Sequence, residues 1–166
     1  MEQYILYLVL KGIIKGLNSK YKVSFNDMDE NGVDVIGVYI KGAEPSQYRE
    51  LSTGRYYNYA ARAQILIQCD NNSNSLFELL NLATKIRDTM ISTSNIIYNS
   101  IPDVRYTDGD YRKINKDTEA VGEAVNLGLS SVSLLGETDF KGKTSQGKAR
   151  YSLNFKIHYF INIGGN

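Results

Sequence analysis

Apolar side chains recur at helical spacing in two parts of this chain. Between residues 1 and 18 they stand three or four positions apart, and the same spacing returns between residues 76 and 90. Glu78 follows Ser75 by three residues, which is the spacing of a helix-capping box. We therefore predict an amphipathic helix over 1–18 and a second one from Ser75 to about Ser92, each packing on a sheet.

Alternation of apolar and polar residues predicts strands in the rest of the chain. From Tyr151 to Ile163 every second side chain is apolar, and only Phe160 disturbs the polar positions between them. The segments 61–69 and 132–140 are also strand-like. A strand with one apolar and one polar face is typical of an antiparallel sheet that is covered on one side.

Two shorter β-rich runs, 21–25 and 33–40, flank a cluster of turn-forming residues and predict a β-hairpin. The resulting fold class is α+β: a mostly antiparallel (mixed) β-sheet, with the N-terminal helix and the central helix packed on one face, and long loops. A chain of 166 residues has enough apolar surface for one ordinary core, so a single domain spanning 1–166 is expected.

The segments 42–60 and 94–125 show no clear period and predict long loops. Loops longer than about 12–15 residues are uncommon in compact domains unless they bind something. The chain has 13 tyrosines and no tryptophan, and many of the tyrosines fall in these two segments. We take eight residues as candidates for a protein interface: Tyr48, Arg49, Arg55, Tyr56, Tyr57, Tyr59, Tyr106 and Tyr111. The alternative, that these tyrosines pack back on their own domain, stays open at this point.

Composition narrows the function classes. Hydrophobic residues make up 42% and charged residues 22%, as in an average soluble protein. A formal net charge of +1 disfavours generic nucleic-acid binding, which needs a clear basic excess. The single Cys69 excludes an internal disulfide and fits a small buried thiol. Lys11 and Lys15 interrupt the apolar run at 5–17, so we expect neither a signal peptide nor a transmembrane helix there.

Two partial motifs resemble ligand-binding loops. Asp27-x-Asp29-x-Asn31-Gly32 matches the opening of a calcium-binding loop, but Val38 stands where the bidentate glutamate belongs. Gly142-Lys143-Thr144 matches the end of a phosphate-binding loop, but Glu137 stands where the upstream glycine belongs. Ordinary turns are the favoured interpretation of both.

Candidates for catalysis are few. His158 lies on the polar face of the last predicted strand without a recognisable nucleophile, so a surface histidine is favoured over a general base. The cluster Asp103, Asp108 and Asp110 has the chemistry to hold a cation, although Gly109 beside them favours a turn. We predict no catalytic residues, no metal site and no cofactor.

The order of these predicted elements resembles the tail terminator or minor capsid proteins of long-tailed bacteriophages and prophages. The resemblance covers most of the chain and depends on layout and on segments such as Ala61-Arg62-Ala63-Gln64-Ile65-Leu66-Ile67 and Tyr151-Ser152-Leu153-Asn154-Phe155-Lys156-Ile157. It implies a non-enzymatic protein, made in the host bacterial cytoplasm and located in the virion tail or neck. That protein completes the tail at the head–tail junction.

The resemblance also implies partners. The chain would form a ring, typically a hexamer, that caps the tail tube protein and joins it to the head–tail connector protein, with DNA only passing through the lumen and no membrane involved. The segments 43–60 and 98–118 are the expected contact patches between subunits. Two alternatives remain: a monomeric adaptor or binding module, and a small enzyme that uses His158 or the acidic cluster at 103–110.

Overall fold

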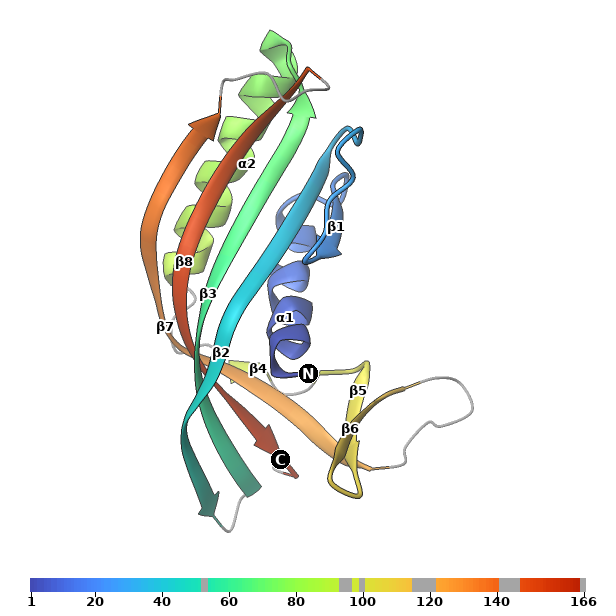
Figure 1. Ribbon diagram of the computed structural model, residues 1–166, viewed down its shortest axis with the longest axis vertical. Coiled ribbons are helices and arrows are strands. Elements are labelled where there is room, and N and C mark those ends of the chain that lie inside the picture. The colour runs from blue at the N-terminus through green and yellow to red at the C-terminus, as the bar shows by residue number, and fades with distance from the viewer. Residues whose placement is uncertain (52–53, 93–96, 99–100, 115–121, 141–146, 165–166) are drawn as a thin grey trace.

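The computed structural model describes residues 1–51, 54–92, 97–98, 101–114, 122–140 and 147–164. Within these ranges, the side chains of 43–44, 46–51, 54, 97–98 and 138–140 are not described. The helices are α1 (Glu2–Leu17) and α2 (Ser73–Ser92), and the strands are β1 (Lys22–Phe25), β2 (Val35–Leu51), β3 (Gly54–Asp70), β4 (Ile97–Tyr98), β5 (Val104–Thr107), β6 (Asp110–Lys113), β7 (Glu123–Phe140) and β8 (Lys148–Ile163) (Figure 1). The predicted α+β class is confirmed.

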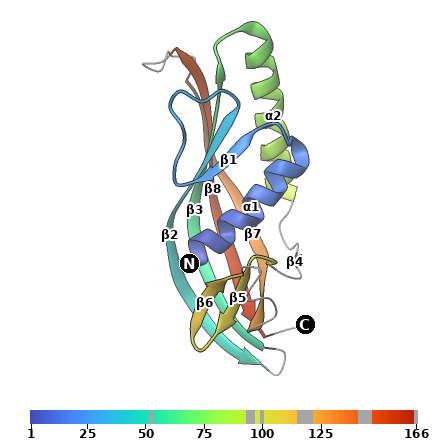
Figure 2. The same ribbon diagram turned by 90° about the vertical axis from the view of Figure 1, so that its right-hand side faces the viewer.

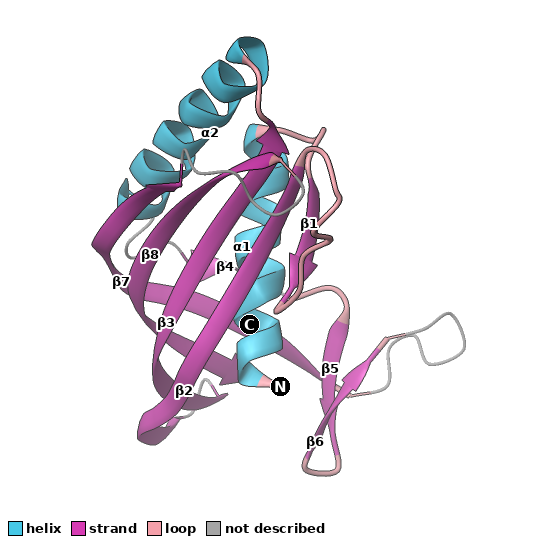
Figure 3. Cartoon of the chain, turned by 45° about the horizontal axis from the view of Figure 1, so that its top comes forward, coloured by secondary structure: helices cyan, strands magenta, loops and turns pink. Residues whose placement is uncertain are grey.

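One curved sheet organises the described part of the chain (Figure 3). Its strand order is β1-β2-β3-β8-β7-β5-β6, and β4 pairs with β7 beside this path. The long strands β2, β3, β8 and β7 form its centre and pair antiparallel. The strands β1 and β6 form its two edges.

Both helices cover the same face of the long strands, as predicted (Figure 2). On β8 the odd-numbered side chains from Leu153 to Ile163 are buried, whereas Lys156 and His158 on the other face are exposed. The buried face joins α1 residues such as Leu6 and Leu10 in an apolar cluster. The predicted alternation of β8 therefore separates a helix-covered face from an uncovered one.

The predicted hairpin over 21–40 is wrong, because β1 pairs with β2 in parallel, with Lys22 opposite Val35 and Phe25 opposite Val38. Asn26 and Asp34 have positive φ angles of 51° and 56°, so the chain turns sharply at both ends of the connection. The Asn26 side-chain oxygen also accepts a hydrogen bond from the Ile40 amide at 2.9 Å, which ties the connection to β2.

The predicted long loop at 42–60 is also wrong, because these residues belong to the hairpin of β2 and β3. The register of β2 against β3 shifts between Lys41 and Glu44 and again between Pro45 and Gln47. Each shift changes the face of the sheet on which the following side chains of β2 lie. Bulges of this kind add a residue to one strand, so they hide the two-residue period from a reading of the sequence.

The segment 94–125 was predicted as mostly loop, but its described residues include β4, β5, β6 and the start of β7.

The second helix is confirmed, but it starts at a different residue. It begins at Ser73, and the side chain of Asn72, not Ser75, caps it by accepting a hydrogen bond from the Ser75 amide at 2.9 Å. Cys69 is fully buried as predicted, and burial raises the pKa of its thiol to about 11.

Candidate protein interface

Two hairpins project from the helix-covered body. The end of the β2–β3 hairpin extends beyond both helices in Figure 1, and Figure 3 shows the β5–β6 hairpin standing away from the long strands. β5 touches the main sheet through only a short ladder, in which Arg105 pairs with Ala124 and Tyr106 with Glu123. These two hairpins carry all eight residues predicted for the interface.

Tyr59 faces the helix-covered side and is only 6% exposed. Its ring stacks on that of Tyr159 with centroids 5.3 Å apart, and the Tyr159 hydroxyl donates a hydrogen bond to the Glu2 carbonyl at the start of α1. Burial raises the pKa of Tyr59 to about 12 and raises that of Tyr159 as well. Tyr59 therefore packs within its own domain, and its partner Tyr159 was not among the predicted site residues.

Tyr106 and Tyr111 face each other across the β5–β6 hairpin. They are a register pair, and their rings meet edge to face at 5.1 Å between centroids. Both are partly buried against the core, as is Tyr57, and burial raises the pKa of Tyr111. Tyr106 and Tyr111 stand one register pair from the turn of the hairpin, pack it against the body, and leave part of each residue accessible.

Arg55 links the two projecting hairpins. Its guanidinium forms an ion pair with Glu123 and lies 5.0 Å from the centroid of the Tyr106 ring. The Arg55 side chain is 30% exposed and that of Glu123 is 52% exposed, so the pair is accessible. Sequence reasoning missed Glu123, because only the strand pairing brings it to Arg55.

Tyr56 lies on the uncovered face beside Phe160, with ring centroids 6.1 Å apart. Phe160 covers the backbone of Gly128, where an added Cβ would lie 2.2 Å from the ring. The apolar exception in the β8 pattern is therefore a cross-strand packing contact. In the backbone register Tyr48 pairs with Tyr57 and Arg49 with Tyr56, but the side chains of Tyr48 and Arg49 lie outside the described set.

The acidic segment 27–32 is a turn, and three of its carbonyl groups accept hydrogen bonds from one side chain. The buried amide of Gln68 donates to the carbonyls of Asp29, Glu30 and Gly32 at 3.0, 3.2 and 2.8 Å. The Gln68 side-chain oxygen accepts from Arg150 Nε at 2.7 Å. Among the described residues, no three acidic, histidine or cysteine side chains are grouped closely enough to hold a metal ion.

The remaining motif residues have simpler positions. Asp108 and Gly109 turn the chain between β5 and β6 with positive φ angles of 52° and 86°, and the predicted turn there is confirmed. His158 is exposed on the uncovered face, as predicted. Gly142-Lys143-Thr144 lies outside the described residues.

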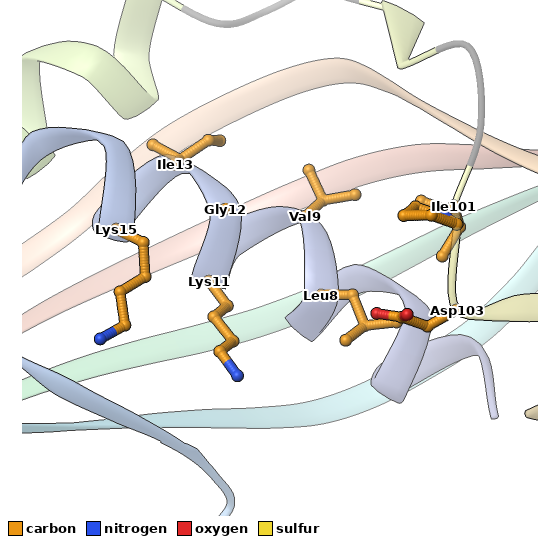
Figure 4. Close-up of a pocket in the computed structure, with 9 residues that line it drawn as sticks. Leu8, Val9, Lys11, Gly12, Ile13, Lys15, Ile101 and Asp103 are labelled. Carbon is orange, nitrogen blue, oxygen red and sulfur yellow. The ribbon is translucent and has the colours of Figure 1, made fainter. Parts of the chain in front are cut away.

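A hollow of about 390 Å³ lies between α1 and the segment 101–103 (Figure 4). Its lining is largely apolar, with Leu8, Val9 and Ile101 on its sides, and Asp103 stands at one end. Lys15 also lines it, but the Lys15 ammonium donates to the carbonyls of Ser19 and Tyr21 at 3.3 and 2.5 Å.

Neither helix of the described chain has the length and apolar character needed to cross a membrane.

Comparisons with known proteins give little further guidance. No protein-family model matches the chain, and no curated protein matches its sequence significantly. Among solved structures, the chain is similar to one from the virion of a native gene transfer agent particle, with 9% sequence identity and a TM-score of 0.46. That alignment covers 94% of this chain and 93% of the other. A likeness at this level carries no argument about function.

Proposed function

We propose that this chain is a non-enzymatic structural protein of a phage-type virion. It acts at the head–tail junction, where a ring of its copies caps the tail tube and joins it to the connector. The observation that carries this proposal is the pair of projecting hairpins, which differ from each other in sequence and reach beyond the helix-covered core (Figures 1 and 3). A subunit that contacts its neighbour through two different patches assembles head to tail, and such contacts close into rings when the rotation allows.

The free edges of the sheet support the same mode of assembly. Within the described residues, β1 pairs only with β2, and β6 pairs only with β5. An edge strand presents unpaired backbone amides and carbonyls, which a neighbouring chain can bind. Arg112 and Lys113 on β6 are exposed, so this edge also carries charge toward a neighbour.

A ring at the head–tail junction would contact a different protein on each of its two sides. The tube protein would lie on one side and the connector protein on the other, with DNA passing through the lumen. A formal net charge of +1 suits a passage that does not retain DNA, because strong phosphate binding needs a larger basic excess.

The test is light scattering on a size-exclusion column over a range of protein concentrations, followed by negative-stain microscopy and a capping assay on purified tail tubes. We expect closed rings or capped tubes from the wild-type chain. The double variant R112E/K113E should form fewer rings, because it reverses the charge at the β6 edge. The control K85E, at an exposed position on α2, should assemble as the wild type does.

Two outcomes would contradict the proposal. A chain that is monomeric at every concentration and leaves tubes uncapped would instead be a monomeric adaptor. Turnover of a substrate would contradict the non-enzymatic assignment.

A further inference from the structure

The uncovered face of the sheet carries a row of three cations on adjacent strands. Lys41 of β2 pairs in register with Arg62 of β3, and Arg62 pairs with Lys156 of β8. All three side chains are exposed. Neighbouring strands lie about 4.8 Å apart, so the row is roughly 10 Å long. We call these three residues the cationic row.

This arrangement is unfavourable for an isolated chain. Like charges directly opposite each other on neighbouring strands repel. Among the described residues, no side chain forms an ion pair with any member of the cationic row. Burial, and to a smaller extent Asp27 and Glu30, raises the pKa of the neighbouring Tyr39, and no ion pair within the described part of the chain joins Asp27 or Glu30 to the row. The row therefore has unused capacity to bind an anion.

The surroundings of the row shape a site for a polar group. Lys41 and Arg62 line a hollow of about 320 Å³ together with Tyr39, Gln64 and Asn154. The amides of Gln64 and Asn154 offer neutral hydrogen-bond donors beside the two cations. On the other side of the row, Lys156 pairs with Ser133, which is exposed and uncharged.

The same chain carries a small anionic projection. The tip of the β5–β6 hairpin consists of Asp108, Gly109 and Asp110, and all three residues are exposed. Neither carboxylate forms an ion pair with a described residue. The left-handed conformations of Asp108 and Gly109 make the turn tight, so the two aspartates flank a single glycine at the end of the hairpin.

The tip and the row belong to different sides of one molecule. Tyr106 and Tyr111 hold the hairpin against the core, which lies on the helix-covered side. The cationic row lies on the uncovered face. Each is therefore available to a second copy.

We propose that the Asp108–Asp110 tip of one copy docks on the cationic row of the next copy. Two carboxylates placed between three cations relieve the repulsion within the row and form charge-assisted hydrogen bonds to it. The contact joins two different patches, so it repeats from copy to copy. This inference deepens the proposed ring and depends on it.

A second copy fits the row better than nucleic acid does. Nucleic-acid binders of useful affinity neutralise many phosphates along an extended basic surface. Here the row is about 10 Å long, and Gln64, Asn154 and Ser133 beside it are neutral. His158, the next residue on this face of β8, is the titratable side chain that follows Lys156 there. A short anionic projection matches that extent, whereas a phosphate backbone would continue past it.

The test is complementation between two charge-reversal variants, measured by sedimentation velocity. R62E/K156E has an acidic row and an acidic tip, and D108K/D110K has a basic row and a basic tip. Each variant alone should lose at least tenfold in self-association. An equimolar mixture should regain it, because every tip then meets a row of opposite charge. K85E serves as the control, and circular dichroism checks that each variant is folded.

The outcomes separate this contact from the proposed function. The docking contact is wrong if the wild type forms rings and either variant alone assembles equally well. It is also wrong if the wild type forms rings and mixing the two variants does not restore self-association. In both cases the proposed ring is still supported. If the wild type neither self-associates nor caps tubes, both proposals fail. Binding of a phosphate-bearing oligonucleotide that is lost in R62E/K156E, without loss of self-association, would reassign the row to nucleic acid.

Discussion

At the scale of single residues, a buried tyrosine is imperfectly accommodated. Tyr21 is fully buried, and its hydroxyl has no hydrogen-bond partner among the described residues. Its backbone carbonyl, in contrast, accepts from the Lys15 ammonium at 2.5 Å. A buried hydroxyl without a partner costs about 1–3 kcal/mol of desolvation. The ring therefore stabilises the core while its hydroxyl opposes that gain.

We expect the substitution Tyr21→Phe to stabilise the fold by about 1 kcal/mol, because it removes the unpaired hydroxyl and keeps the ring. Burial, with a smaller effect of Asp34, raises the pKa of Tyr21 from 10.0 to about 12. Between these pH values the unfolded chain loses the phenol proton first, so wild-type stability falls as pH rises through this window. The variant should lose less stability there.

Urea unfolding at pH 8 and at pH values from 10 to 11.5 measures both effects. Tyr4→Phe, which changes a partly buried tyrosine on α1, is the matched control. A Tyr21→Phe variant that is less stable than the wild type at pH 8 would show that the hydroxyl has a partner in solution.

At the scale of elements, the β2–β3 hairpin depends on one residue with a left-handed conformation. Gly42 has a φ angle of 67° and lies within the first register shift of β2. A non-glycine residue rarely adopts this conformation, and apart from the adjoining residues no described atom lies within 4 Å of the position that a Cβ would take. The requirement for glycine is therefore one of backbone conformation, not of space.

The substitution Gly42→Ala should destabilise the fold by about 1 kcal/mol through backbone strain. Gly136→Ala is the matched control, because Gly136 also lies at a register shift and also has open space, but has no positive φ angle. It should be neutral or slightly stabilising. Thermal unfolding of both variants gives the comparison, and equal effects would mean that the bulge tolerates a side chain in either conformation.

The elements also show what the sequence could and could not predict. The helices, β8 and the covered face were predictable, because their apolar spacing is continuous from Tyr151 to Ile163 and along each helix. The β2–β3 hairpin was not, because its register shifts break the period. The parallel pairing of β1 was hidden by a turn composition that also fits a hairpin.

The sequence suggested candidate interface residues by their type, but it did not show how they are arranged. Tyrosine content drew attention to Tyr59 and Tyr106, but Tyr59 is buried and Tyr106 packs against Tyr111. The cationic row was invisible in the sequence, since Lys41, Arg62 and Lys156 are far apart along the chain and meet only through strand register. When each strand contributes a single charged residue, no short stretch of the sequence shows that the charges lie together.

At the scale of the whole molecule, the cationic row is unfavourable in a single chain and favourable in an assembly. Cross-strand pairs contribute roughly 0.2–1 kcal/mol, and directly opposed like charges destabilise the sheet. Arg62 is the central member of the row and faces a cation on each side. Removing its charge should therefore affect the isolated chain and the assembly in opposite directions.

We expect Arg62→Gln to raise the stability of the monomer by about 0.5 kcal/mol at low salt and to weaken self-association several-fold. Arg62→Lys keeps the charge and should change neither quantity much. The stability gain should shrink at 0.5 M salt, because screening already weakens the repulsion between exposed charges in the wild type. Urea unfolding at low protein concentration measures the first effect and sedimentation velocity the second. A variant that loses stability at low salt would show that the row is not under repulsion, and the electrostatic basis of the docking contact would then fail even if rings form.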